Sequence, residues 1–163
     1  MKHLLLVRHA KSSWANPGQA DFDRQLNERG HKDAPMMAKR ILDRDITIDS
    51  IITSTALRAL TTAEYFAHAN EIPKSKMIQH DFLYHAPPER FAKAIVLIPD
   101  EIHTAAIFAH NPGITDFVNQ LTSTRIDDMP TCAIFAIRID TLSWKNWAKA
   151  KKEFWFADWP KQV

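Results

Sequence analysis

The sequence predicts an α/β fold in which helices cover both faces of a mostly parallel sheet. Short apolar runs alternate with segments of helical periodicity along most of the chain, as in strands that are joined by crossover helices. The length of 163 residues, with 45% hydrophobic and 25% charged residues, is typical of one globular unit with one core. We therefore expect residues 1–163 to form a single three-layer α/β/α domain.

The first strand and the first helix are predicted near the N-terminus. Residues 4–7 form a short apolar run that predicts a strand. Apolar residues then recur at helical spacing from Ala34 to Leu42. Because proline is tolerated in the first turn of a helix, Pro35 indicates a helix that begins here, with Asp33 as its N-cap.

The rest of the chain continues this alternation up to its last quarter. Strands are expected over residues 48–53, 77–80, 104–109 and 132–139, and helices after Ser54 or Thr55 as the cap, after Pro88 and after Gly113. Four tryptophans then crowd the C-terminal region, namely Trp144, Trp147, Trp155 and Trp159. We expect them to pack against the edge of the sheet, since aromatic side chains dominate protein cores.

The composition excludes several classes of protein. Lys and Arg number 21 against 19 Asp and Glu, a formal charge of +2 that is too mild and too interspersed for a nucleic-acid-binding surface. A single cysteine excludes an internal disulfide and a cysteine-based zinc site. Arg8 and His9 end the first apolar run, and no run of 18 apolar residues occurs elsewhere. We expect a cytoplasmic protein that does not bind membranes.

Cationic or imidazole side chains follow three of the predicted strands. Arg8 and His9 follow the first, Arg58 the second, and His110 the strand over 104–109. The carboxyl ends of parallel strands meet at one edge of a sheet, where ligands bind in open α/β folds. Taken singly, each of these residues is more often solvated or structural. Together they predict a site for an oxyanion such as phosphate, for which arginine is well suited.

The sequence also contains the spacing of a cysteine phosphatase motif, which the predicted secondary structure argues against. Cys132 and Arg138 match the C-x5-R spacing of cysteine phosphatases. The five residues between them contain no glycine and predict a strand, which would hold the thiol and the guanidinium roughly 20 Å apart. A phosphate-binding loop must instead fold back on itself.

Three ordered segments resemble the signatures of the histidine phosphatase superfamily, in its branch with an Arg-His-Gly motif. They are Arg8-His9-Ala10-Lys11-Ser12, Ser54-Thr55-Ala56-Leu57-Arg58-Ala59 and His110-Asn111-Pro112-Gly113. Ala10 in place of glycine, the stretch Asp21–Leu26 and the short chain resemble the SixA-type phosphohistidine phosphatases. The resemblance spans most of the chain and implies a phosphoglycerate mutase-like fold.

The resemblance also implies roles for individual residues. His9 would be the nucleophile that becomes phosphorylated, Arg8 and Arg58 would hold the phosphoryl oxygens, and His110 would stabilise their charge in the transition state. Neither a metal nor another cofactor is implied. Asp81, which follows the strand over 77–80, is the candidate general acid, with a loop or capping role as the alternative.

Two more residues are candidates for contacts with the substrate. Ser12 can offer its hydroxyl to the phosphate, although a plain loop role is an equal alternative, and His85 can line the rim of the site. Ala15 occupies the place where many relatives carry asparagine, so phosphosugar-type contacts are in doubt.

The expected function is that of a cofactor-independent phosphatase that acts on phosphohistidine in a protein. The segment between Arg58 and His110 is nearly all used by a helix, a strand and a helix, which leaves little chain for a lid over a small substrate. A small-metabolite phosphatase is the alternative enzyme. A catalytically silent phosphate-binding module would be expected to lack one of the four residues Arg8, His9, Arg58 and His110, and all are present.

Overall fold

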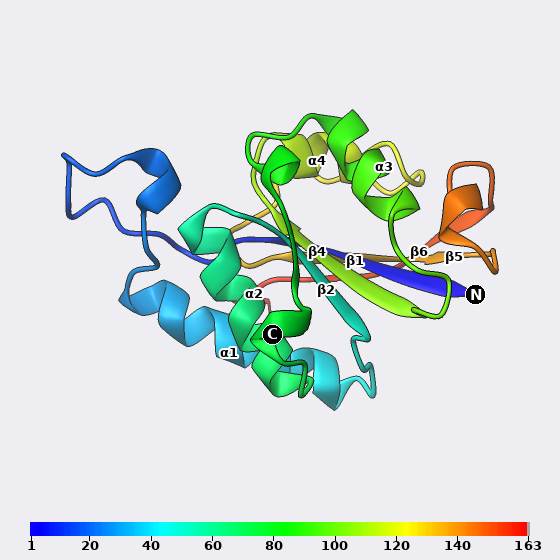
Figure 1. Cartoon of the computed structure of the whole chain (residues 1–163), viewed down its shortest axis with the longest axis horizontal. Helices are drawn as coiled ribbons and strands as arrows, with labels where there is room; N and C mark the ends of the chain where they lie inside the picture. The colour runs from blue at the N-terminus through cyan, green and yellow to red at the C-terminus, as the bar shows by residue number, and fades with distance from the viewer. Residues whose placement is uncertain (163) are drawn as a thin grey trace.

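The computed structural model describes residues 1–162, which form a six-stranded sheet in the order β3-β2-β4-β1-β5-β6 (Figure 1). The strands are β1 (Lys2–Arg8), β2 (Ser50–Ser54), β3 (Ile78–His80), β4 (Thr104–Ala109), β5 (Ile134–Ile139) and β6 (Lys152–Asp158). Strands β1 to β4 pair in parallel, whereas β5 is antiparallel to both β1 and β6. The predicted α/β class with a mostly parallel sheet is confirmed.

Four α-helices cover the two faces of this sheet. They are α1 (Glu28–Asp43), α2 (Leu57–Ala69), α3 (Pro88–Val96) and α4 (Gly113–Val118), and short 3-10 helices lie at η1 (Asp21–Asp23), η2 (Lys74–Lys76), η3 (Asp81–Leu83) and η4 (Trp144–Asn146). Figure 1 shows α1 and α2 on one face and α3 and α4 on the other. The result is the three-layer arrangement that the sequence predicts.

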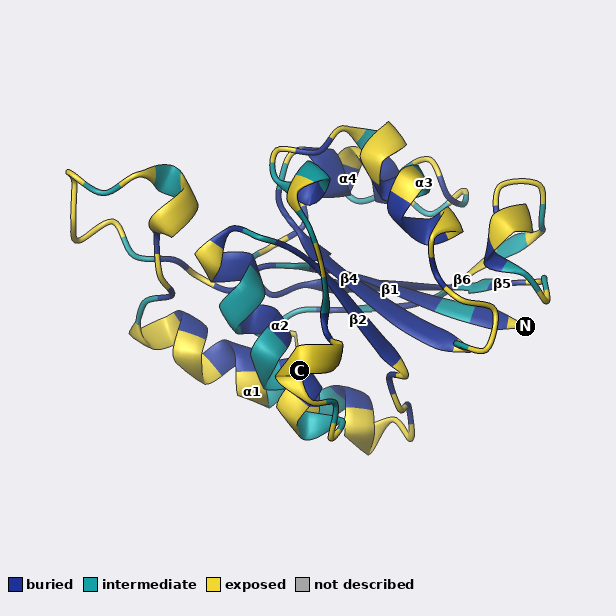
Figure 2. Ribbon diagram, viewed as in Figure 1, coloured by how far each residue is buried: buried dark blue, intermediate teal, exposed yellow. Residues whose placement is uncertain are grey.

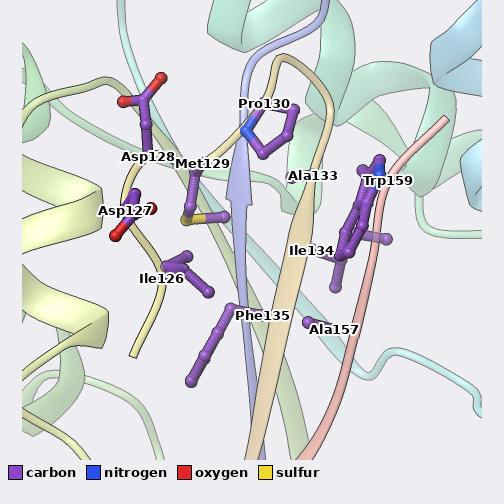
Figure 3. A pocket seen from close by; sticks show the side chains of 10 residues that line it. All are labelled: Ile126, Asp127, Asp128, Met129, Pro130, Ala133, Ile134, Phe135, Ala157 and Trp159. Carbon is purple, nitrogen blue, oxygen red and sulfur yellow. The ribbon is translucent and has the colours of Figure 1, made fainter. Parts of the chain in front are cut away.

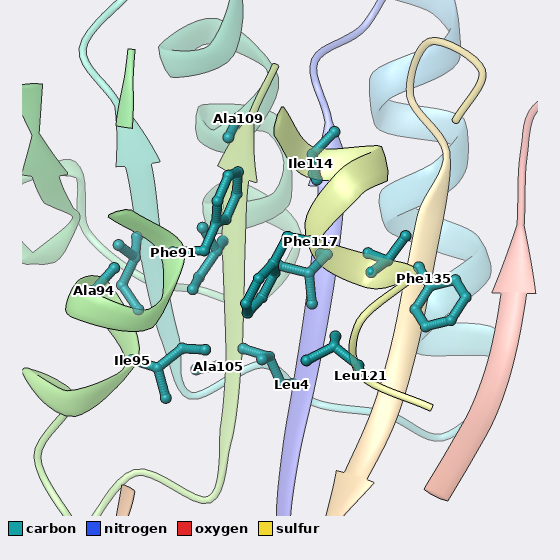
Figure 4. Packing of buried hydrophobic residues seen from close by; sticks show 14 of the residues in the cluster. Leu4, Phe91, Ala94, Ile95, Ala105, Ala109, Ile114, Phe117, Leu121 and Phe135 are labelled. Carbon is teal, nitrogen blue, oxygen red and sulfur yellow. The ribbon is translucent and has the colours of Figure 1, made fainter. Parts of the chain in front are cut away.

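The core is divided into two parts by the sheet, whose central strands are buried on both sides (Figure 2). Leu4 and Leu6 of β1 pack with α3 and α4, whereas Leu5 and Val7 pack with α1 and α2. Figure 4 shows the first of these parts, in which Phe117 of α4 lies over the sheet. Burial on both faces explains why β1 is a continuous apolar run and not an alternating one.

Helix α1 begins earlier than the sequence predicted. Its N-cap is Asn27, whose side chain accepts a hydrogen bond of 2.9 Å from the backbone N–H of Gly30. Asp33 lies inside the helix, so its prediction as the N-cap was wrong. Pro35 is also internal and leaves the carbonyl of His31 without its helical partner. The helix continues because its apolar side packs against the sheet, and packing outweighs local propensity.

The C-terminal tryptophans divide between core and edge. Trp144 is completely buried and donates from Nε1 to the carbonyl of Ile102 at 2.8 Å, and Trp147 packs in the same core. Trp155 and Trp159 are half-buried, on and just after the edge strand β6. No helix in residues 1–162 is long and apolar enough to cross a membrane.

Candidate active site

The structure brings Arg8, His9, Arg58 and His110 together in one cavity of about 280 Å³. Arg8 ends β1 and His9 follows it, Arg58 lies in the first turn of α2 after β2, and His110 follows β4. Because β1, β4 and β2 are adjacent and parallel, their carboxyl ends deliver these side chains to one edge. The cavity is also lined by Lys11, Ser12, Trp14, Asp21, Arg24, His85, Asn111 and Thr131.

His9 is held as a neutral imidazole whose Nε2 lone pair faces Arg58. Its Nδ1 lies 2.8 Å from the carbonyl of Ala10, to which it donates, and Arg58 Nε donates to its Nε2 at 3.4 Å. Burial, together with the charges of Arg58 and Arg8, lowers the pKa of His9 to about 3. Nε2 therefore carries no proton near neutral pH and is the ring atom that is able to attack an electrophile.

Hydrogen bonds hold both the guanidinium and the backbone of Arg58 in place. Its Nη1 donates to the backbone carbonyl of Asp21 at 2.7 Å and its Nη2 donates to the Asp21 carboxylate at 3.0 Å. Behind it, the buried hydroxyl of Thr62 donates to the Arg58 carbonyl at 2.8 Å and accepts from the N–H of Ala10 at 2.9 Å. These bonds tie the first turn of α2 to the segment that carries His9.

The carboxylate of Asp21 also lines this site, and the sequence predicted no role for it. Besides Arg58, it accepts from the hydroxyl of Tyr84 at 2.6 Å and from Arg24 Nε at 3.1 Å. Although desolvation opposes the shift, these hydrogen bonds and the charge of Arg58 hold the pKa of Asp21 well below its usual range. Asp21 is thus ionised and has no proton to donate. The only signal in the sequence was its place in the Asp21–Leu26 stretch.

Two buried nitrogens at the site have no hydrogen-bond partner within residues 1–162. They are Nε of Arg8, whose Nη1 donates to the carbonyl of Met129 at 2.7 Å, and Nδ1 of His110, whose Nε2 lies 2.8 Å from the hydroxyl of Ser54. Buried polar atoms are rarely left unpaired in proteins. Both residues line the cavity, and both nitrogens are hydrogen-bond donors when the proton of His110 is on Nδ1, so the arrangement suits a phosphoryl group.

The environment of His110 keeps its imidazole neutral near neutral pH. Burial, with the nearby His9 and Arg58, lowers the pKa of His110 to about 2. Its partner Ser54 was predicted as a helix cap, but α2 has Ala56 as its N-cap with no side-chain bond. The Ser54 hydroxyl instead accepts from the N–H of Ala56 at 3.2 Å and orients His110.

The weaker sequence candidates lie in different environments. Ser12 lines the cavity, and its hydroxyl accepts a short hydrogen bond from Arg24. His85 is exposed at the rim, with its Nε2 3.9 Å from the Asp21 carboxylate. Asp81, the first residue of η3, is exposed and is not among the residues that line the cavity.

Cys132 has none of the features of a reactive thiol. It does not line the cavity, is completely buried in the core beside α1, and burial raises the pKa of its thiol. Arg138 lies on β5 with its guanidinium over the ring of Trp155, at 4.6 Å from the centroid. Within residues 1–162, no group of three or more His, Cys, Asp or Glu side chains is placed to hold a metal ion.

Comparison with known proteins assigns the family. The sequence profile described as the histidine phosphatase superfamily (branch 1) matches residues 4–81. The chain belongs to this superfamily. It is 31% identical over 121 residues to the uncharacterised protein ML1117 of Mycobacterium leprae, a match that covers 72% of each chain. It is also 32% identical over 87 residues to the serine/threonine-protein phosphatase Pgam5 of Drosophila simulans, which covers 53% of this chain but only 29% of that longer relative.

Several solved structures share the fold of this chain. A protein of Agrobacterium tumefaciens assigned as the phosphohistidine phosphatase SixA superposes with a TM-score of 0.76 at 29% identity, over 85% of this chain and 92% of that one. The protein histidine phosphatase SixA in complex with tungstate gives a TM-score of 0.81 at 18% identity, over 97% of each chain. A mycobacterial glucosyl-3-phosphoglycerate phosphatase gives 0.71 at 13% identity, over 100% of each chain. At 18% and 13% identity, the SixA–tungstate complex and the glucosyl-3-phosphoglycerate phosphatase show similarity of fold alone.

Proposed function

We propose that the protein is a phosphatase that works through a phosphohistidine at His9 and that its substrate is phosphohistidine in another protein. The lone pair of His9 Nε2 forms a bond to phosphorus while the bond from phosphorus to the substrate imidazole breaks. Water then attacks phosphorus, the bond to Nε2 breaks, and inorganic phosphate leaves. Splitting one displacement into two steps is the general advantage of a nucleophilic side chain.

The observation that carries this proposal is the buried pair of unpartnered nitrogens beside a neutral His9. Arg8 Nε and His110 Nδ1 have no hydrogen-bond partner within residues 1–162, and Arg58 Nε lies 3.4 Å from the atom that would attack. Phosphoryl transfer depends on positioning and on the neutralisation of charge on the phosphoryl oxygens. These groups supply both without a metal ion.

The state of the nearby carboxylate supports an imidazole as the leaving group. Asp21 is ionised and held by three side-chain donors, so it offers no proton to a departing group. An alkoxide needs such a proton, whereas phosphohistidine that is protonated on its other ring nitrogen, a group with a pKa near 6.5, expels neutral imidazole with much less help. A site of this kind is better suited to phosphohistidine than to an alkyl phosphate.

The alternative is a phosphatase for small metabolites, because the same fold is found in the glucosyl-3-phosphoglycerate phosphatase. Initial rates with a phosphohistidine peptide, free phosphohistidine, p-nitrophenyl phosphate and a panel of sugar phosphates separate the two. We expect the phosphohistidine compounds to have the highest kcat/KM. A sugar phosphate preferred by an order of magnitude would support the alternative, and no hydrolysis of any compound would indicate a silent phosphate-binding module.

Asp81 remains a prediction as the general acid. If it acts on the leaving group, Asp81→Asn slows an alkyl phosphate much more than it slows phosphohistidine. Equal rates in the variant and the wild type with both substrates would remove Asp81 from the mechanism. Its exposed position outside the cavity lining makes this test necessary.

A further inference from the structure

An apolar groove lies directly beside the candidate active site. Its volume is about 330 Å³, and it is lined by Ile126, Asp127, Asp128, Met129, Pro130, Ala133, Ile134, Phe135, Ala157 and Trp159. Figure 3 shows Ile126 and Met129 on one side, Trp159 on the other, and the first residues of β5 between them. The mechanism uses none of these side chains.

The groove and the phosphate cavity share one short segment of chain. Met129 lines the groove, while its backbone carbonyl accepts hydrogen bonds from Arg8 Nη1 at 2.7 Å and from Asn111 Nδ2 at 3.1 Å. Asn111 also donates to the carboxylate of Asp128 at 2.8 Å, and Thr131 lines the phosphate cavity. The phosphate cavity and the groove therefore adjoin each other at residues 128–131.

The charges of the two sites are opposite. The phosphate cavity is lined by four cations, Arg8, Lys11, Arg24 and Arg58, against one carboxylate, that of Asp21. Asp127 and Asp128 at the edge of the groove are both exposed, and neither takes part in an ion pair within residues 1–162. This pattern is complementary to a segment with an anionic phosphoryl group followed by a cation and an apolar side chain.

We propose that the groove binds a segment of the phosphoprotein substrate, placing one aliphatic or aromatic side chain against Trp159 and Met129 and a neighbouring Lys or Arg beside Asp127. The proposal rests on the proposed function, since it names how that substrate is recognised. The groove matches the size of a pocket for a single side chain with flanking backbone, and anchors of this kind supply most of the affinity in peptide recognition. It gives the enzyme a preference for sequence around the phosphohistidine that the phosphate cavity alone does not have.

The test uses peptides of equal length with one phosphohistidine in a Gly and Ser background. A Leu-Lys pair is moved through successive positions on either side of the phosphohistidine, and kcat and KM are measured for each peptide. We expect one position to lower KM by about tenfold relative to the background peptide, the size of effect that burial of one leucine produces, with kcat unchanged. Equal KM values for all positions would overturn the proposal.

Variants of groove residues test whether the preference for the Leu-Lys pair arises in the groove. Trp159→Ala removes one wall, Ile126→Lys places a charge inside, and both are expected to abolish the gain from leucine. Trp155→Ala is the matched control, because Trp155 packs on the opposite face of the sheet, and it is expected to keep the gain. If thermal unfolding shows that Trp159→Ala is not folded, the result with Ile126→Lys decides whether the groove binds the leucine. A preference that survives in Ile126→Lys would overturn the proposal.

Two measurements separate this proposal from its alternatives. Free phosphohistidine does not reach the groove, so its hydrolysis should be the same in all variants. If the wild type hydrolyses no phosphohistidine compound, the proposed function is wrong. If it hydrolyses every peptide equally well, only the proposal that the groove binds the substrate is wrong. Sedimentation of the wild type and of Ile126→Lys shows whether the groove is covered by a second copy. A dimer that dissociates in the variant would overturn binding of a substrate segment.

Discussion

The carboxylate of Asp21 and the guanidinium of Arg58 lie 3.0 Å apart, and this contact leaves Arg58 Nε facing His9 Nε2 at 3.4 Å. Asp21 comes from the loop after β1 and Arg58 from α2. The loop therefore supplies two hydrogen bonds that orient the guanidinium of Arg58. In the proposed mechanism Asp21 is a positioning residue, which acts on the phosphoryl group through Arg58.

Replacing Asp21 by Asn should weaken this orientation while keeping the shape of the side chain. We expect kcat/KM for phosphohistidine to fall by about tenfold, the value of one charged hydrogen bond. In an Arg58→Ala background the same change should have little further effect, because the residue it positions is gone. Asp23→Asn, on the same 3-10 turn, is the matched control and should be silent. Additive losses in the double variant would contradict the positioning role.

The buried histidines should make the protein less stable as the pH falls below about 6.5. The pKa of His9 is lowered to about 3 in the folded state, so between 6.5 and 3 the unfolded chain binds a proton that the folded chain does not. Stability should then decrease by on the order of 1 kcal/mol per pH unit over this range. Denaturant unfolding of the wild type and of His9→Asn between pH 7 and 4 measures it, and a constant difference between the two curves would contradict it.

Anions that imitate phosphate or its transition state should bind in the cavity. Orthovanadate and tungstate are expected to inhibit the enzyme and to raise its Tm, since a ligand that binds only the folded state stabilises it. Arg8→Ala and Arg58→Ala should each reduce the shift in Tm, whereas Arg125→Ala, on the exposed surface, should keep it. An undiminished shift in Tm in both cavity variants would show that the anion binds elsewhere.

Removal of metal ions with EDTA is expected to leave the hydrolysis rate unchanged.

Cys132→Ala should retain the full rate of hydrolysis. The thiol is buried in the core, and burial raises its pKa, so it neither reacts nor reaches the cavity. Iodoacetamide should also leave the folded wild type active. A cost in thermal stability is expected because a small cavity is created. Loss of activity in a folded Cys132→Ala variant would reopen the C-x5-R alternative.

The site residues that follow strands could be predicted from the sequence, because a cationic or imidazole side chain stands directly after an apolar run that predicts a strand. Arg8, His9 and His110 each come directly after an apolar run, and parallel strands carry them to one edge. Asp21 could not be placed in this way. It lies in a polar loop, and its contact with Arg58 depends on how that loop folds over the edge of the sheet.

The start of α1 shows a second limit of local signals. Pro35 and Asp33 are favourable at a helix N-terminus, and they predicted one there, yet the capping bond is made by Asn27. The turns before Asp33 are stabilised by tertiary packing of Gly30, which is close enough to Lys11 that a Cβ atom would lie 2.2 Å from its carbonyl oxygen. A contact between segments so far apart in the sequence is not encoded in local propensity.

In the proposed mechanism the phosphoryl group passes through His9. Mixing the enzyme with a 32P-labelled phosphohistidine peptide, quenching in alkali within one turnover, and mapping the label by mass spectrometry tests it directly, because phosphohistidine survives alkali and is lost in acid. We expect the label on His9 in the wild type, and neither label nor hydrolysis in a folded His9→Ala variant. Label on another residue, or continued hydrolysis by His9→Ala at the rate of the wild type, would contradict the claim.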